Sequence, residues 1–201
     1  MKILFYGDSN TYGFDPRGPV PGRYDKDKIW PYIAAERIEK AEVHARGQNG
    51  RKLPSADFDF EVMFNTIRQF LPLDLFALML GTNDYIYMPA PDMDEVIRRV
   101  EHTVDMINKE FPRQKILLIA PPPLKTANVC GMQKYDTTDG RMSKAYKNLA
   151  NERGLLFFDA AAGPLSMAFD GVHLSEDGHR QLGIRLGDFL QKMNALNFGE
   201  L

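Results

Sequence analysis

Residues 1–10 read MKILFYGDSN, and this stretch decides how the fold is interpreted. Residues 3–6 are consecutive apolar and aromatic side chains, a pattern typical of a parallel strand that is covered on both faces. Gly7, Asp8 and Ser9 follow at once, and glycine permits the unusual backbone angles or close approach of a sharp turn. The stretch therefore predicts a buried strand that ends in a turn carrying a serine hydroxyl.

Four more apolar runs alternate with helical patterns along the chain. The predicted strands are residues 3–6, 42–46, 73–80, 116–120 and 155–158. The predicted helices are residues 29–40, 57–71, 93–111, 141–153 and 176–196. Regular alternation of strand and helix predicts a three-layer α/β/α fold around a five-stranded parallel sheet. At this length we expect a single domain over residues 1–201.

Two segments rich in proline or glycine, residues 13–28 and 121–140, show no helical or strand pattern. Long loops in compact domains are usually functional or disordered. Both segments follow strand ends, where open α/β sheets bind their ligands. We expect them to form the walls of a pocket, with flexible surface loops as the alternative.

The charge balance and the single cysteine limit the classes of partner. The 201 residues carry 25 basic and 27 acidic side chains and no basic block, which argues against a nucleic-acid partner. Cys130 has no second cysteine to pair with, which fits a reducing compartment. Residues 1–7 are too short for a signal peptide, and no later run reaches membrane-spanning length. We therefore expect a cytoplasmic protein without a membrane partner.

Motifs for metals and nucleotides are missing from the sequence. No HExxH, CxxC or clustered His and carboxylate spacing indicates a metal, and no GxGxxG or P-loop indicates a nucleotide. We expect no cofactor and no metal. His44, His102 and His179 fit structural or solvated positions. The oligomeric state stays open, and a homo-oligomer is possible.

Three further segments carry polar groups that suit acyl transfer: GQNG at 47–50, GTND at 81–84 and DGVH at 170–173. The first two follow predicted strands, and the third shortly precedes a predicted helix. Ser9 would supply the nucleophile, and the three-residue spacing would let Asp170 hold His173 in the tautomer that accepts the serine proton.

The Asn83 amide and the Gly50 backbone N–H would donate hydrogen bonds to the developing oxyanion. Each residue alone also fits an ordinary structural role. Ser9 can cap a helix, Asn83 and Gly50 can form turns, and Asp170 and His173 can be a turn aspartate and a surface histidine. Because loops after parallel strands share one edge of the sheet, the combination favours chemistry over separate turns.

In this order the four segments resemble the blocks of the SGNH, or GDSL-type, hydrolase family, whose name lists serine, glycine, asparagine and histidine. The resemblance spans nearly the whole chain. PLDL at 72–75, MLGTND at 79–84 and APPPL at 120–124 look most like the small arylesterase and acyltransferase branch. It implies a flavodoxin-like architecture, with the catalytic and oxyanion roles falling on Ser9, Gly50, Asn83, Asp170 and His173, and with the Ser9 N–H as a third oxyanion donor.

Asn10 departs from this pattern, because it replaces the leucine of GDSL. It lies beside the nucleophile, so we expect it to change the polarity of the acyl pocket. Tyr12, Phe14 and Tyr85 flank the catalytic segments and are expected to bind substrate, although they fit core positions equally well.

The glycine block is the other open point. Gly47 is a rival to Gly50 for the oxyanion hole, and we prefer Gly50 because it follows Asn49 in a motif-like spacing.

The function predicted from these residues is a serine esterase that hydrolyses small, short-acyl esters through an acyl-enzyme, with acyl transfer to alcohols as a second outcome. A carbohydrate O-acetylesterase would use the same residues with a sugar-binding pocket. A catalytically silent binding protein on the same fold is the alternative from another class. An assay with p-nitrophenyl acetate separates the last from both enzymes.

Overall fold

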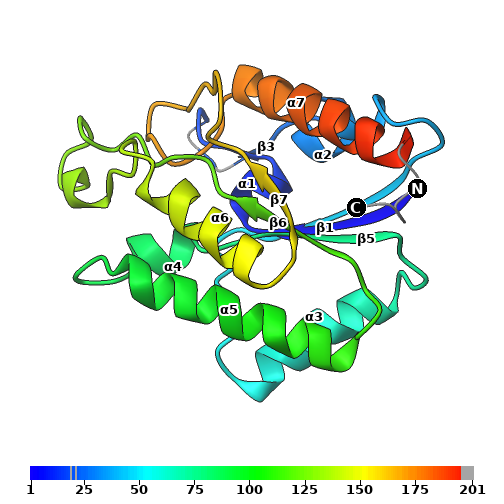
Figure 1. The fold of residues 1–201 in the computed structure, drawn as a ribbon. Coiled ribbons are helices and arrows are strands. Elements are labelled where there is room, and N and C mark those ends of the chain that lie inside the picture. Colours follow the sequence, from blue (N-terminus) through cyan, green and yellow to red (C-terminus); the bar gives the residue numbers. More distant parts are fainter. Residues whose placement is uncertain (19, 21, 196–201) are drawn as a thin grey trace.

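Five parallel strands form the central sheet of the computed structural model, which describes residues 1–18, 20 and 22–195. They are β1 (Lys2–Gly7), β4 (Glu42–Gly47), β5 (Leu75–Met79), β6 (Ile116–Ala120) and β7 (Leu156–Asp159). Their order across the sheet is β4-β1-β5-β6-β7 (Figure 1). β1 therefore lies between β4 and β5, and the segments that follow these three strands emerge side by side.

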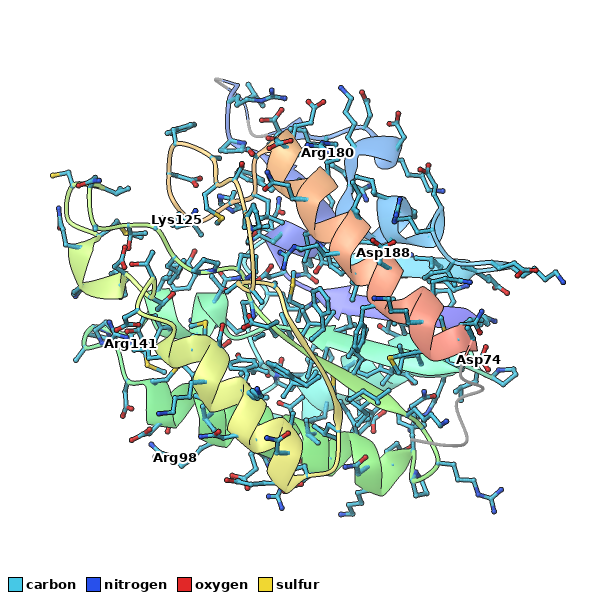
Figure 2. The ribbon with its side chains drawn as sticks, turned by 45° about the horizontal axis from the view of Figure 1, so that its top comes forward. Asp74, Arg98, Lys125, Arg141, Arg180 and Asp188 are labelled. Atoms are coloured by element: carbon cyan, nitrogen blue, oxygen red, sulfur yellow. The ribbon has the colours of Figure 1, made fainter. Side chains whose placement is uncertain are left out.

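Helices cover both faces of the sheet (Figure 1). α2 (Trp30–Ala35) and α7 (Glu176–Ala195) lie on one face, and α3 (Asp57–Arg68), α5 (Met93–Glu110) and α6 (Arg141–Glu152) lie on the other. Charged side chains such as Arg98 and Asp188 stand on the outer surfaces of these layers (Figure 2). This arrangement confirms the predicted three-layer fold.

The apolar strands divide their side chains between two cores because successive residues point to opposite faces. Ile3 and Phe5 of β1 belong to the core beneath α2 and α7. Leu4 and Tyr6 belong to the core beneath α3, α5 and α6. All residues of β5 and β6 are buried, which explains why the strands appear in the sequence as unbroken apolar runs.

Close packing of α7 on α2 depends on two glycines one helical turn apart. A Cβ at Gly183 would lie 2.6 Å from Cβ of Ile33, and one at Gly187 would lie 2.9 Å from the Ala34 carbonyl oxygen. Only glycine leaves room for this approach. The packing encloses Trp30, whose side chain is fully buried.

Several elements differ from the sequence prediction. The helix expected over residues 29–40 ends at Ala35, and Lys40 has a φ of 54°, which is outside the helical range. The helix expected over residues 57–71 ends at Arg68, and Leu196, the expected end of the last helix, lies outside the described residues.

Short elements were not predicted. The segment 13–28 contains a small hairpin of β2 (Phe14–Asp15) and β3 (Gly22–Arg23) and a 3₁₀ turn, η1 (Lys26–Lys28), and the segment 121–140 contains another, η2 (Gln133–Tyr135). Two short helices, α1 (Ser9–Tyr12) and α4 (Thr82–Ile86), directly follow β1 and β5. They position the candidate site. No helix within the described residues combines the length and the apolarity needed to cross a bilayer.

We predict that Gly47→Ala destabilises the fold, because the new Cβ would lie 2.0 Å from the backbone nitrogen of Tyr12 and backbone cannot move aside cheaply. We expect a loss of about 3 kcal/mol, the upper range of overpacking, which lowers the Tm by roughly 6–12 °C. Thermal unfolding followed by circular dichroism measures this.

Gly154→Asn is the matched control. Gly154 has a φ of +62° with nothing within 4 Å of its Cβ position, and asparagine tolerates left-handed backbone. Its Tm should stay close to that of the parent protein. Equal Tm values for both variants would contradict the steric argument.

Candidate active site

Ser9 is the first residue of α1, immediately beyond the end of β1. Asp8 caps this short helix by accepting a hydrogen bond from the Asn10 N–H at 2.9 Å. Gly7 makes the turn possible, since a Cβ there would lie 2.1 Å from Thr11 Oγ1 and 2.8 Å from the Met79 carbonyl oxygen. The strand end therefore turns sharply enough to present Ser9 at the carboxyl edge of the sheet.

His173 connects Ser9 to Asp170. Its Nε2 lies 3.0 Å from Ser9 Oγ, and its Nδ1 lies 2.7 Å from Asp170 Oδ2. Because an ionised carboxylate only accepts hydrogen bonds, the proton of the neutral ring sits on Nδ1, and Nε2 is free to accept from the serine hydroxyl. The three side chains thus form one hydrogen-bonded chain, as the sequence spacing predicts.

The turn at 170–173 is held by hydrogen bonds between its backbone and the side chain of Asp170. Asp170 Oδ1 accepts hydrogen bonds from the N–H groups of Val172 and His173, both at 2.9 Å. Gly171 has a φ of +69°, and a Cβ there would lie 2.1 Å from the Lys125 carbonyl oxygen. Lys125 also donates its N–H to the Gly171 carbonyl at 2.8 Å, and Figure 2 shows it beside the loop that precedes α7. The loop after β6 therefore clamps this turn.

The carboxylates of Asp170 and Asp8 lie near Ser9, and their pKa values are shifted in opposite directions. Burial raises the pKa of Asp170, but the hydrogen bonds from His173 and from the backbone outweigh it, so the pKa lies below its ordinary value. Asp170 is therefore ionised wherever a neutral imidazole can act as base. Burial dominates at Asp8 and raises its pKa from 3.8 to about 6, against the lowering effects of the Asn10 N–H and of His173.

Asn83 is the second residue of α4, and its side chain is buried. Its Nδ2 donates one hydrogen bond to the Arg51 carbonyl at 3.0 Å, and the primary amide carries a second N–H. The neighbouring Asp84 accepts the N–H of Leu53 at 3.0 Å. Consecutive side chains of α4 therefore hold the segment that contains Gly50.

The two glycines of the second segment have different surroundings. Gly47 ends β4 and is packed against the backbone of α1, whereas Gly50 has a φ of +72° and nothing within 4 Å of its Cβ position. Packing alone explains a glycine at position 47. The positive φ likewise explains a glycine at position 50, so the choice of Gly50 for the oxyanion hole stays a prediction.

Arg51 and Asp84 were not singled out in the sequence analysis. The Arg51 guanidinium donates to the Gly7 carbonyl at 2.8 Å and lies 4.0 Å from the ring centre of Tyr6, so it ties the Gly50 segment to the end of β1. Both residues directly follow a candidate oxyanion residue. Their place next to a candidate oxyanion residue was the one sequence signal for these two residues. Their contacts join segments far apart in the chain, and such contacts leave no periodic pattern in the sequence.

The residues expected to bind substrate lie in three different environments. Phe14 packs on the imidazole of His173 with ring centres 4.5 Å apart, and the Arg23 guanidinium lies 4.5 Å from the ring centre of Tyr12. Tyr85 is only 1% exposed and belongs to the core below α4. We correct the expectation for Tyr85: its aromatic ring fills the core and does not line the pocket.

Asn10 also differs from expectation. Its side chain is 2% exposed, and both atoms of its amide are bonded to backbone, Nδ2 to the Val172 carbonyl and Oδ1 to the Leu174 N–H. A side chain engaged in this way does not present a free polar group to an acyl chain. The expected polar acyl pocket at Asn10 is therefore wrong.

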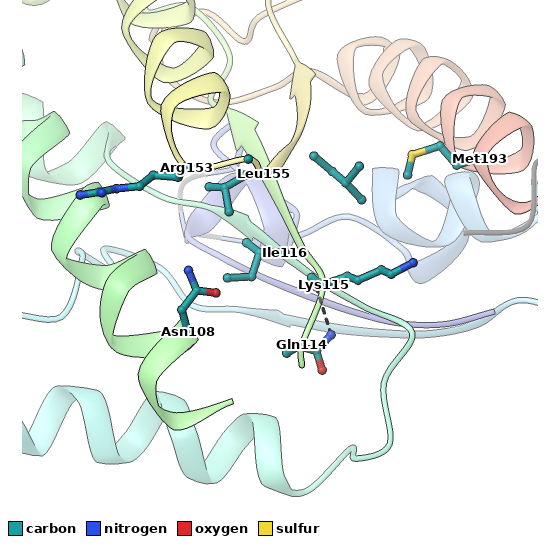
Figure 3. A pocket seen from close by; sticks show the side chains of 9 residues that line it. Asn108, Gln114, Lys115, Ile116, Arg153, Leu155 and Met193 are labelled. Carbon is teal, nitrogen blue, oxygen red and sulfur yellow. Dashed lines mark hydrogen bonds between the residues drawn. The ribbon is translucent and has the colours of Figure 1, made fainter. Parts of the chain in front are cut away.

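Among the cavities of the described residues, two lie at opposite edges of the sheet. One of about 440 Å³ adjoins Gly50 and Arg51 and extends to α3. The other, of about 270 Å³, is drawn in Figure 3 and lies at the amino ends of β6 and β7, with Asn108, Gln114 and Met193 in its wall. The first shares the edge with Ser9. Among residues 1–18, 20 and 22–195, no three His, Cys, Asp or Glu side chains are grouped as metal ligands.

Comparison with known proteins gives one family model and similar solved structures. A family model described as GDSL-like lipase/acylhydrolase matches residues 5–181. A carbohydrate acetylesterase family member from Sinorhizobium meliloti has a similar structure, with a TM-score of 0.83 at 28% identity over 96% of this chain and 99% of that one. The aryl esterase of M. smegmatis gives 0.81 at 25% identity over 95% and 98%, respectively. No curated protein sequence matches the chain.

We predict that Asp8→Asn increases stability at neutral pH. Because burial raises the pKa of Asp8 in the folded state, the contribution of Asp8 to stability is greatest below pH 3.8 and is lost as the pH rises through about 6. Asparagine keeps an oxygen to cap α1 but carries no charge. Above pH 7 the variant should be more stable by about 2–3 kcal/mol, the free energy equivalent of the pKa shift.

Urea unfolding of both proteins at pH 4 and pH 8 measures the difference. The gap should be small at pH 4 and larger at pH 8. A gap of the same size at both pH values would show that Asp8 carries no such burial cost.

Proposed function

This chain belongs to the GDSL-like lipase/acylhydrolase family, and we propose that within it the protein is a serine esterase that cleaves short-acyl esters through an acyl-enzyme on Ser9. As a member of this family with esterases among its structural neighbours, it is an ester hydrolase. The observation that carries the finer proposal is the chain of contacts from Ser9 Oγ through His173 to Asp170, at 3.0 Å and 2.7 Å.

In the acylation step His173 Nε2 takes the proton of Ser9 as Oγ attacks the ester carbonyl carbon. Asp170 stays ionised and stabilises the imidazolium that forms. The tetrahedral intermediate then collapses, the bond to the alcohol oxygen breaks, and the imidazolium returns its proton to the leaving alcohol. The acyl group remains on Ser9 as an ester.

The negative charge of the intermediate rests on three donors: the Ser9 N–H, the Gly50 N–H and the second amide N–H of Asn83. These donors are held in advance, because Asn83 is bonded to the Arg51 carbonyl and Asp84 to the Leu53 N–H. Donors that need no reorganisation during the reaction give the largest stabilisation.

Deacylation follows the same two steps, with water as the nucleophile and Ser9 as the leaving group. His173 Nε2 takes a proton from water as its oxygen attacks the acyl carbon, and the imidazolium returns that proton to Ser9 Oγ when the bond to the acyl group breaks and the acid leaves. An alcohol in place of water gives acyl transfer, so the balance between the two products depends on which nucleophile occupies the site.

A carbohydrate O-acetylesterase is the second candidate. It is favoured by the structural neighbour from Sinorhizobium meliloti that is described as a carbohydrate acetylesterase family member. Acetate release from acetylated xylose and from phenyl acetate, compared as kcat/KM, distinguishes the two candidates. A higher value for the sugar ester selects the carbohydrate enzyme.

We predict graded losses for three variants of the proposed catalytic groups. Ser9→Ala should abolish esterase activity, and Asn83→Ala should lower kcat by about 10²–10³, the usual cost of removing one oxyanion donor. Asp170→Asn should be severe because the asparagine amide can donate to Nδ1 and so hold the ring in the wrong tautomer, and it carries no charge to stabilise the imidazolium. Steady-state kinetics with p-nitrophenyl acetate gives these values, and an unchanged kcat in Asn83→Ala would contradict its donor role.

We predict a preference for short acyl groups. The sequence shows no lid-like amphipathic insertion. The structural neighbour from Sinorhizobium meliloti is described as a carbohydrate acetylesterase family member, which also favours acetyl esters. Each methylene buried in an apolar tunnel would contribute about 0.8 kcal/mol, so a deep pocket would raise kcat/KM steeply with chain length. Across p-nitrophenyl acetate, butyrate, octanoate and palmitate, kcat/KM should level off or fall after butyrate. A rise through octanoate would point to a lipase or thioesterase.

A further inference from the structure

We propose that Asn10 is a positioning residue, which aligns His173 with Ser9 by bonding to the backbone on both sides of the histidine. The inference rests on the proposed function, since it assigns Asn10 a role in the reaction of that site. Asn10 is the residue at which this chain departs from the leucine of the GDSL motif.

The amide of Asn10 makes a two-point contact with the segment that carries the proposed base. Its Nδ2 donates to the Val172 carbonyl at 3.1 Å, and its Oδ1 accepts from the Leu174 N–H at 2.8 Å. Val172 and Leu174 are the residues immediately before and after His173. The amide therefore fixes both the position and the rotation of the peptide units on which the imidazole is mounted.

The backbone of Asn10 is itself held by two hydrogen bonds. The Asn10 N–H donates to Asp8 Oδ1 at 2.9 Å, and the Asn10 carbonyl accepts from Trp30 Nε1 at 2.8 Å. Trp30 is fully buried and packs edge-on against Phe5 of β1, with ring centres 4.9 Å apart. Asn10 is thus held by groups of the sheet and of α2, so it provides a rigid point of attachment.

Ser9 and Asn10 are consecutive residues of α1, so the nucleophile and this attachment point move as one unit. The contact spans 162 and 164 positions of the sequence, and the contact between Ser9 and His173 also spans 164. A leucine could make neither hydrogen bond. It would also leave the Leu174 N–H without the bond it makes here, in a site with little access to water.

The kinetic consequence differs from that of a substrate-binding residue. Misalignment of the base slows the chemical step without changing how the ester is bound, so kcat falls and KM stays nearly constant. Loss of a substrate contact would raise KM. The two roles are therefore separable with the same measurement.

The test compares Asn10→Leu, which removes both hydrogen bonds, with Asn10→Asp, which keeps the acceptor for Leu174 but replaces the donor to Val172. We expect kcat for p-nitrophenyl acetate to fall by about 10²-fold in Asn10→Leu, the scale of a small misplacement of reacting groups. Asn10→Asp should lose about tenfold, as a partial version of that misplacement. If Asn10→Leu fails to fold, Asn10→Asp decides the outcome.

Thr11→Val is the matched control. Thr11 is the next residue of α1 and is fully buried, and its hydroxyl has no hydrogen-bond partner among the described residues. Valine has the same shape, so kcat should stay at the parental value. A comparable loss in Thr11→Val would show that α1 tolerates no substitution, and the positioning role of Asn10 would fall.

A double-mutant cycle adds a result that a general structural role would not produce. In a His173→Ala background, measured under single-turnover conditions with excess enzyme, Asn10→Leu should cause no further loss, because its effect passes through the histidine. The same fractional loss in both backgrounds would overturn the proposal. So would a raised KM at unchanged kcat, or parental kinetics in a folded Asn10→Leu.

Ser9→Ala separates this failure from that of the proposed function. Activity that persists in Ser9→Ala would overturn the serine-esterase proposal and this inference with it. Activity that is lost in Ser9→Ala but kept in both Asn10 variants would overturn the inference alone.

Discussion

The parallel pairing of β1 between β4 and β5 is the constraint on which the candidate site depends. Gly7, the last residue of β1, is paired with Gly47 on one side and with Met79 on the other. The three strands therefore end at one level, and the turns that follow them meet. Glycine at positions 7 and 47 is required because α1 folds back against both strand ends at a distance that no Cβ could occupy. The location of Ser9 thus follows from backbone geometry before any side-chain chemistry is considered.

Three carboxylates around the site accept hydrogen bonds from the backbone; two of them, Asp8 and Asp84, are buried, and Asp170 is half-buried. Asp8 caps α1, Asp84 holds the Leu53 N–H, and Asp170 closes the turn that carries His173. Burial raises the pKa of Asp8 and Asp84, so both raise the free energy of the folded state at neutral pH. Asp170 differs because it gains enough hydrogen bonds to remain ionised. Among these three, the carboxylate that orients the proposed base is the one whose charge the fold favours.

The sequence was sufficient for the layers of the fold, because unbroken apolar runs indicate strands covered on both faces. It also brought together Ser9, Asp170 and His173, which the structure places in hydrogen-bond contact. It missed α1 and α4, because helices of four and five residues are too short to show a helical period. Tyr85 was misplaced, since an aromatic residue beside a motif can face either the pocket or the core. The contacts of Asn10 could not be foreseen, because both partners are backbone groups far along the chain.

The distance in sequence between Ser9 and His173 also bears on biosynthesis. In a chain still attached to the ribosome, β1, β4 and β5 are translated, with the proposed nucleophile and oxyanion donors, before His173. Ser9 and Asn10 then lack the hydrogen-bond partners that the segment before α7 supplies in the folded protein. The proposed site therefore stays incomplete until His173 has been translated and its turn has folded against α1.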